Sequence, residues 1–272
     1  MRETVAGLLL ALGIIAGGSL LPDRAGDPQL SHRELKVATN SGWVPQSYLD
    51  EHNRLIGFDI DVAREIARRL GMTVSFETPE FSAMTGGHWH GRWDMAVGSV
   101  TPTKARSQVV DFAGTYYYSP YVFAVNNSSA ASSIDDLNGK EIGVETGTTS
   151  EDYIRQRLQI DAPDAPPVNY RVTPGGVRTY ADSMLPFDDL RLGDGVRLDA
   201  VIAPEQTVLR AIQNGYAIKI LPGYAFREPL TVITDKGSPQ WTAKVAGIIA
   251  AMKADGTLAT LTTKWYGKDY SH

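Results

Sequence analysis

The residues best suited to chemistry lie between Gly98 and Arg106, in the stretch Gly-Ser-Val-Thr-Pro-Thr-Lys-Ala-Arg. This stretch follows an apolar, strand-like run, and Thr101 followed by Pro102 is typical of the start of a helix, where backbone N–H groups are left free. Free N–H groups attract anions, and an arginine about one turn later can hold a carboxylate with two parallel hydrogen bonds. The stretch predicts a carboxylate-binding corner, and it fits a plain capped helix with a solvated arginine equally well.

A second corner of the same kind lies at Gly147-Thr148-Thr149, directly after the strand-like run 141–144. Hydroxyl residues here precede acids at the spacing of a capping box, which predicts another helix start. Simple capping explains this corner as well as anion binding does.

Several other chemistries are excluded by the sequence. It contains no cysteine, and therefore no disulfide, thiolate metal site or thiol nucleophile. It also lacks a phosphate loop, a dinucleotide fingerprint and a Gly-x-Ser-x-Gly elbow. His88 and His90 flank Trp89 without a third ligand at suitable spacing, so we expect a loop there rather than a metal site. No metal or other cofactor is expected.

Length and charge favour a globular protein with one large domain or two lobes. The chain has 272 residues, 43% of them hydrophobic, and a net charge of -5, which provides no basic field for nucleic acid. An apolar run from Val5 to Leu21 follows Arg2 and precedes a polar stretch, as in a signal peptide, which we assign to residues 1–28. An uncleaved anchor helix is the alternative. We expect an exported protein with no stable membrane insertion after signal removal.

The elements that must position these corners alternate between strands and helices. Strands are predicted at 35–39 and 72–76 around a helix at 61–70, which is an α/β unit. An aromatic-rich run at 116–125 followed by a polar linker predicts a strand that passes into a second lobe. Later segments predict a helix at 180–192 interrupted by Pro186, a strand at 198–203, a helix at 204–214, strands at 217–221 and 230–233, and closing helices within 241–265.

Placed in this order, the motifs resemble the bacterial extracellular solute-binding proteins of family 3, the periplasmic amino-acid-binding components of ABC transporters. The similarity covers residues 35–266 and rests on Gly57-Phe58-Asp59-Ile60-Asp61, Gly98 to Arg106, Gly143 to Glu151, Leu198-Asp199-Ala200, and Lys253-Ala254-Asp255-Gly256. The resemblance implies an α/β, two-lobed periplasmic-binding-protein fold of type II, with its lobes joined by two hinge strands. Lobe 1 would comprise residues 32–121 and 229–272, and lobe 2 residues 122–228.

The resemblance also implies ligand-binding roles. Arg106 matches the carboxylate-binding arginine of the family, and Ser99 and Thr101 match residues that bind ligand through hydroxyl and backbone groups. The remaining matched positions are Thr149 with its neighbour Thr148, which contact the same carboxylate from the second lobe, and the ligand-covering aromatics Trp43 and Phe81.

The positions that would bind the amine group of a ligand depart from the family pattern. Positions where relatives carry acids hold Asn40 and Pro204, and an unpaired buried ammonium costs several kcal/mol. Glu145 and Glu205 are the candidate replacements, unless the ligand has no α-amine.

The predicted function is a monomeric periplasmic solute-binding protein that delivers a small carboxylate-bearing, amino-acid-like ligand to an ABC permease without catalysis. The alternative is an enzyme on the same scaffold that resembles cyclohexadienyl dehydratase and acts on prephenate or arogenate.

Overall fold

A computed structural model describes residues 34–162, 165 and 167–272 of the chain. The predicted signal segment 1–28 lies outside these residues. The first half of the described chain contains strands β1 (Glu34–Ala38), β2 (Gly42–Trp43), β3 (Ser47–Leu49), β4 (Leu55–Ile56), β5 (Thr73–Glu77), β6 (Met95–Val100) and β7 (Val110–Asn126), with helices α1 (Phe58–Leu70) and α2 (Phe81–Thr85) and a 3₁₀ turn η2 (Arg106–Gln108).

The second half has the same alternating character. It contains the 3₁₀ turn η3 (Ile134–Leu137), strands β8 (Glu141–Glu145), β9 (Gly176–Tyr180), β10 (Ala200–Pro204), β11 (Ile218–Ile220) and β12 (Phe226–Asp235), and helices α3 (Thr149–Ile154), α4 (Leu185–Leu190), α5 (Glu205–Gln213), α6 (Pro239–Ala254) and α7 (Thr257–Tyr266).

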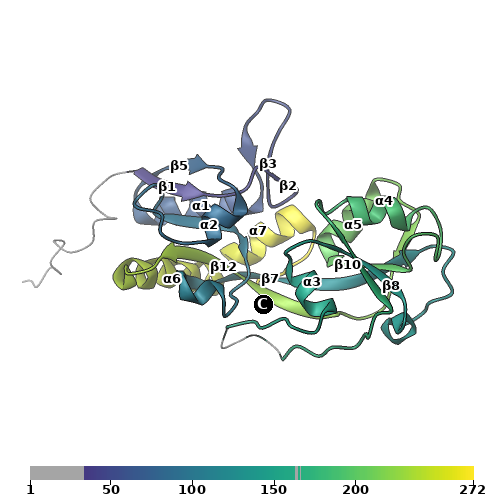
Figure 1. The fold of residues 1–272 in the computed structure, drawn as a ribbon. Coiled ribbons are helices and arrows are strands. Elements are labelled where there is room, and N and C mark those ends of the chain that lie inside the picture. The colour runs from purple at the N-terminus through teal and green to yellow at the C-terminus, as the bar shows by residue number, and fades with distance from the viewer. Residues whose placement is uncertain (1–33, 163–164, 166) are drawn as a thin grey trace, which may run out of the picture.

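Two long antiparallel strands run through both halves of the molecule (Figure 1). The order of the main sheet is β5-β1-β6-β12-β7-β10-β8-β9, with β11 paired to β7. Strand β7 is 17 residues long, so its first part pairs with β12 and its last part with β10 and β11. β7 and β12 are therefore the two hinge strands of a two-lobed α/β fold.

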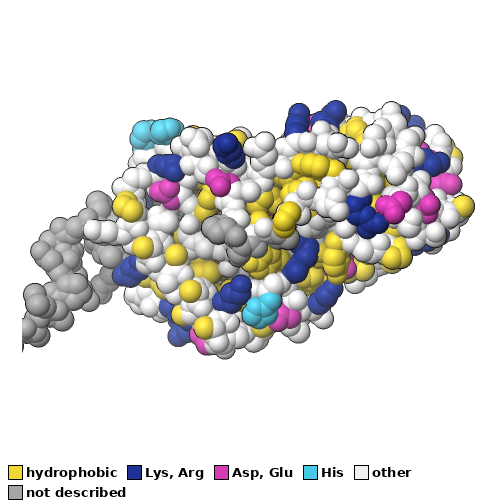
Figure 2. Space-filling model, turned by 90° about the horizontal axis from the view of Figure 1, so that it is seen from below, with side chains coloured by type: hydrophobic (Ala, Val, Ile, Leu, Met, Phe, Trp, Pro, Cys, Tyr) yellow, Lys and Arg dark blue, Asp and Glu magenta, His cyan; other side chains and the backbone are white. Residues whose placement is uncertain are grey.

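Each half has its own apolar core, which is why each can move as a body. In the first half, helices α1, α6 and α7 bury Phe58, Trp241 and Leu258 against the strands. In the second half, Phe123 and Tyr153 belong to one buried cluster, and a second cluster lies under α4 and α5. Among the described residues, no helix is both long and apolar enough to span a bilayer. Lysine and arginine side chains are scattered over the face seen in Figure 2.

Hydrophobic periodicity predicted most elements to within a few residues, including β1, α1, β8 and α5. Two predictions were wrong. No helix begins at Thr101 and Pro102, because the chain there pairs with the second half: Thr103 bridges Ile160, and the N–H of Asp161 donates to the carbonyl of Pro102 at 2.7 Å. Residues 180–192 do not form one helix, because Tyr180 ends strand β9 and α4 begins only at Leu185.

Candidate ligand-binding cleft

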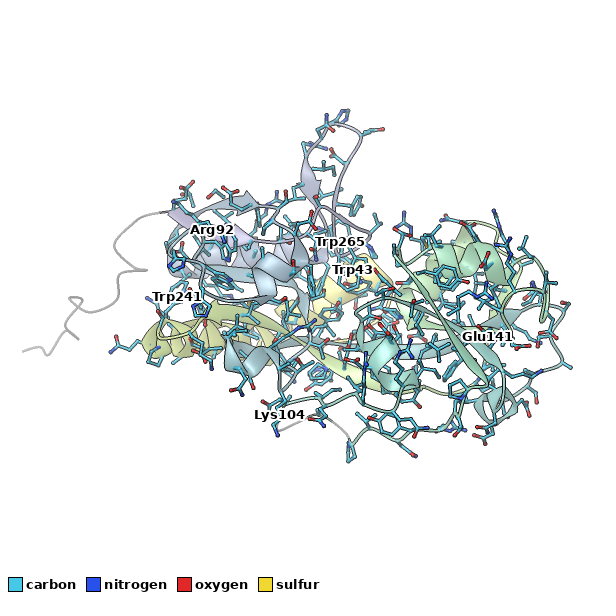
Figure 3. All side chains as sticks on the ribbon, in the orientation of Figure 1. Trp43, Arg92, Lys104, Glu141, Trp241 and Trp265 are labelled. Atoms are coloured by element: carbon cyan, nitrogen blue, oxygen red, sulfur yellow. The ribbon has the colours of Figure 1, made fainter. Side chains whose placement is uncertain are left out.

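A cavity of about 600 Å³ lies between the two halves. Its walls are formed where strands β1, β6, β8, β9 and β10 end, and ligands of open α/β sheets bind at such strand ends. Trp43 lies at the boundary between the halves (Figure 3). Of the ten residues predicted to bind ligand, nine line the cavity: Asn40, Trp43, Phe81, Ser99, Thr101, Arg106, Glu145, Thr148 and Thr149.

Arg106 is held at the cleft by contacts with its own loop. Its Nη1 donates to the carbonyl of Thr101 at 2.9 Å, and its guanidinium lies 5.2 Å from the ring centre of Phe81. Burial lowers the pKa of Arg106, while the charge of Glu228 raises it, and an arginine stays protonated in proteins. The guanidinium thus folds back towards Thr101 as predicted, from a 3₁₀ turn rather than from a helix.

Ser99 lies at the cleft but directs its donors into the protein interior. Its hydroxyl lies 3.0 Å from an oxygen of Asp59 and 2.7 Å from the hydroxyl of Tyr117, and its N–H donates to Tyr116 at 2.9 Å. Burial raises the pKa of Asp59 to about 7, against the lowering effect of hydrogen bonds from Tyr116 and Ser99. The predicted role of Ser99 in ligand binding therefore lacks free donors, because Asp59 engages its hydroxyl and Tyr116 its backbone N–H.

The second corner retains a helix start. Thr148 is the N-cap of α3, and its hydroxyl donates to the carbonyl of Glu145 at 2.7 Å. The hydroxyl of Thr149 donates to that of Tyr121 at 3.2 Å. The first N–H groups of a helix have no intrahelical partner, so backbone donors of this turn remain for a ligand.

Of the two acids proposed for the amine end, only one reaches the cavity. Glu145 lines it, and burial together with the nearby charge of Asp182 raises its pKa to about 7. Glu205 does not line it, because its carboxylate accepts a 2.7 Å hydrogen bond from Tyr270 and lies 3.6 Å from Lys268. Glu205 therefore cannot replace the acid missing at its neighbour Pro204.

The sequence analysis missed a cleft residue on the second hinge strand. Glu228 is 2% exposed and lines the cavity, and it accepts a hydrogen bond of 2.8 Å from the hydroxyl of Thr101. Strand β12 begins at Phe226, whereas its apolar run was read only from Leu230, which left Glu228 in an apparent loop. An acid inside an otherwise apolar strand was the available signal. Asp182, Glu80 and Tyr121 also line the cavity and were not predicted.

The histidine-tryptophan segment lies outside the cleft. Trp89 is fully buried in the first half. The backbone N–H groups of His88 and Trp89 each donate to the carboxylate of Asp235 at 2.8 Å. The described residues hold no cluster of three or more potential metal ligands. Trp89 therefore packs into the first half, and the segment does not line the cleft.

The fold and cleft define a two-lobed ligand-binding protein, and comparisons specify which class. Residues 35–268 match the model of the bacterial extracellular solute-binding proteins, family 3. The chain is 29% identical to the L-cystine-binding protein TcyJ of Escherichia coli K12, over 98% of this chain and 96% of that protein. The chain therefore belongs to this family.

Two solved structures extend the comparison. An ancestral arginine-binding protein bound to arginine has a TM-score of 0.68 and 30% identity, covering 87% of this chain and 99% of that one. The ancestral amino acid-binding protein AncCDT-1, a precursor of cyclohexadienyl dehydratase, has a TM-score of 0.69 and 25% identity, covering 88% and 97%. Amino-acid binding is thus the activity named in these relatives.

Proposed function

We propose that this chain is a periplasmic solute-binding protein that delivers an amino-acid-like, carboxylate-bearing ligand to an ABC permease. The observation that carries the proposal is Arg106, a partly buried cation at the cleft that forms no salt bridge with any acid of the described chain. A partly buried guanidinium that no carboxylate of the protein occupies is a site for a bidentate carboxylate of a ligand.

The remaining contacts complete the proposed site. Thr101 lies beside Arg106, and Thr148 and Thr149 face the ligand from the second lobe with the backbone of α3. Trp43 and Phe81 would cover its apolar part. Closure of lobe 1 (32–121 and 229–272) on lobe 2 (122–228) would bury the ligand, and the permease would recognise the closed form. We propose export by the 1–28 segment and a monomeric state.

The dehydratase alternative has less support. The relatives compared are binding proteins by name, and AncCDT-1 is itself described as amino acid-binding. We therefore propose binding without catalysis.

Thermal unfolding of the chain, stripped of co-purified ligand by denaturation and refolding, tests the proposal. The screen would include amino acids, polyamines, opines and organic acids, prephenate and arogenate among them. A ligand at 100 times its Kd stabilises the folded state by about 2.7 kcal/mol, so an amino acid should raise Tm clearly. Stabilisation by no amino acid, or turnover of prephenate or arogenate, would contradict the proposed function.

A further inference from the structure

Glu228 is a buried carboxylate without a cationic partner. It is 2% exposed, it lines the cleft, and no lysine or arginine within the described chain forms a salt bridge with it. Burying a lone carboxylate is costly, and structures normally offset that cost with a cation or with several hydrogen bonds.

The partners that Glu228 does have are neutral. Thr101 donates at 2.8 Å, and the nearby hydroxyls of Thr149 and Tyr121 also lower the pKa of Glu228. These groups come from the first lobe, the second lobe and the other hinge strand. They hold the carboxyl group at the cleft and provide no opposite charge.

A cation acts on Glu228 from the same cleft: the charge of Arg106 lowers the pKa of Glu228 against the raising effect of burial. Both residues line the same cavity, and Thr101 contacts both, through its carbonyl to Arg106 and its hydroxyl to Glu228. The cleft therefore presents a guanidinium and a carboxyl group that both contact Thr101. An α-amino acid carries the complementary pair, a carboxylate and an ammonium on one carbon.

We infer that Glu228 is the counter-ion of the α-ammonium group of the ligand, so that Arg106 and Glu228 together select α-amino acids. The inference rests on the proposed function and deepens it. Glu145 lies at the end of β8 beside Asp182, away from the hinge strands, and faces the remainder of the ligand. Glu205 lies outside the cleft.

The test compares Glu228→Gln with the wild-type chain on two pairs of probes. The pairs are L-arginine with 5-guanidinopentanoic acid and L-cystine with 3,3′-dithiodipropionic acid, in which the second member lacks the α-amine. Glu228→Gln keeps the size and most hydrogen bonds of the side chain and removes its charge. By analogy with buried charge pairs, it should weaken binding of the amino acid by about 30-fold or more. Binding of the deaminated analogue should change by less than about 3-fold, since the analogue has no group for Glu228 to pair with.

Two controls accompany the variant. Glu205→Gln removes an acid outside the cleft and should leave all affinities unchanged, and Tm without ligand reports whether each variant is folded. An equal loss for amino acid and analogue would assign Glu228 a structural role only. Unchanged affinity of Glu228→Gln for the amino acid would overturn the inference alone. Binding of neither amino acid by the wild-type chain would overturn the proposed function together with it.

A measurement on the wild-type chain keeps the inference testable if Glu228→Gln does not fold. The charged or titratable groups facing Glu228 are Arg106, Tyr121 and Tyr117, and neither tyrosine ionises near neutral pH because burial raises the pKa of both. An ammonium paired with Glu228 favours its ionised form, so across a pH series the amino acid should release protons on binding that the deaminated analogue does not release. Calorimetry in buffers of different ionisation enthalpy measures this release, and equal proton counts for both members of a pair would contradict the inference.

Discussion

Thr101 donates its hydroxyl to Glu228 at 2.8 Å, which joins the loop after β6 to the hinge strand β12. Both side chains are buried, so removing the donor leaves a carboxylate in the interior with one hydrogen bond fewer. Thr101→Val should destabilise the protein by about 1 to 3 kcal/mol. Chemical denaturation of both chains measures this change.

A matched control for that variant is Thr260→Val, on the exposed face of α7, where the hydroxyl bonds only the carbonyl of Gly256. The control should change stability by about 0.5 kcal/mol or less. Because the lost bond favours ionised Glu228, the cost of Thr101→Val should be larger at pH 8 than at pH 5. Equal costs at both pH values would show that the bond does not act on the charge.

Asp59 gives a second, independent pH dependence. Its pKa is raised by burial from 3.8 to about 7, so between these values the folded state holds a proton that the unfolded state has lost. Stability contributed by this group is therefore complete below about pH 4 and is lost as the pH rises towards 7. Asp59→Asn cannot ionise, and its unfolding free energy should fall less between pH 5 and 8 than that of the wild-type chain. Parallel pH profiles would contradict the buried, proton-holding state of Asp59.

Substitution of Gly57 tests how closely the backbone before α1 is packed. Its φ is +137°, and a Cβ there would lie 2.2 Å from the carbonyl oxygen of Gln46. Gly57→Ala should cost about 2 to 4 kcal/mol, because strain and backbone overlap add. Gly71→Ala, at φ +70° with open space around it, is the control and should cost about 1 to 2 kcal/mol. Similar losses of unfolding free energy in the two variants would mean that the backbone around Gly57 shifts to remove the overlap without cost.

Sequence patterns predicted the helices and strands whose formation depends mainly on neighbouring residues. The apolar faces of α1 and α5 are visible in a few neighbouring positions, and both helices form where expected. Thr101-Pro102 matches the statistics of a helix start, but the bridge of Thr103 to Ile160 overrides that preference. Strand β9 escaped prediction because it is an edge strand, with exposed Arg178 and Thr179.

The cleft residues likewise differ in whether neighbouring residues or distant contacts determine their positions. Arg106, Trp43 and Thr149 belong to recognisable local motifs and line the cavity. The burial of Glu228 could not be read from its neighbours, because it results from contacts with Thr101 and Tyr121, more than a hundred positions away in sequence. Glu205 failed as a cleft residue for the converse reason, since Tyr270 holds its carboxylate outside.

The central claim is that Arg106 holds the carboxylate of an amino-acid ligand. Titration calorimetry of the ligand-stripped wild-type chain and of Arg106→Ala, with the amino acid that raises Tm most, tests it directly. We expect saturable binding by the wild-type chain and a loss of about 3 to 5 kcal/mol, or more than 100-fold in Kd, in the variant. Equal affinity of the two chains for that amino acid would contradict the account.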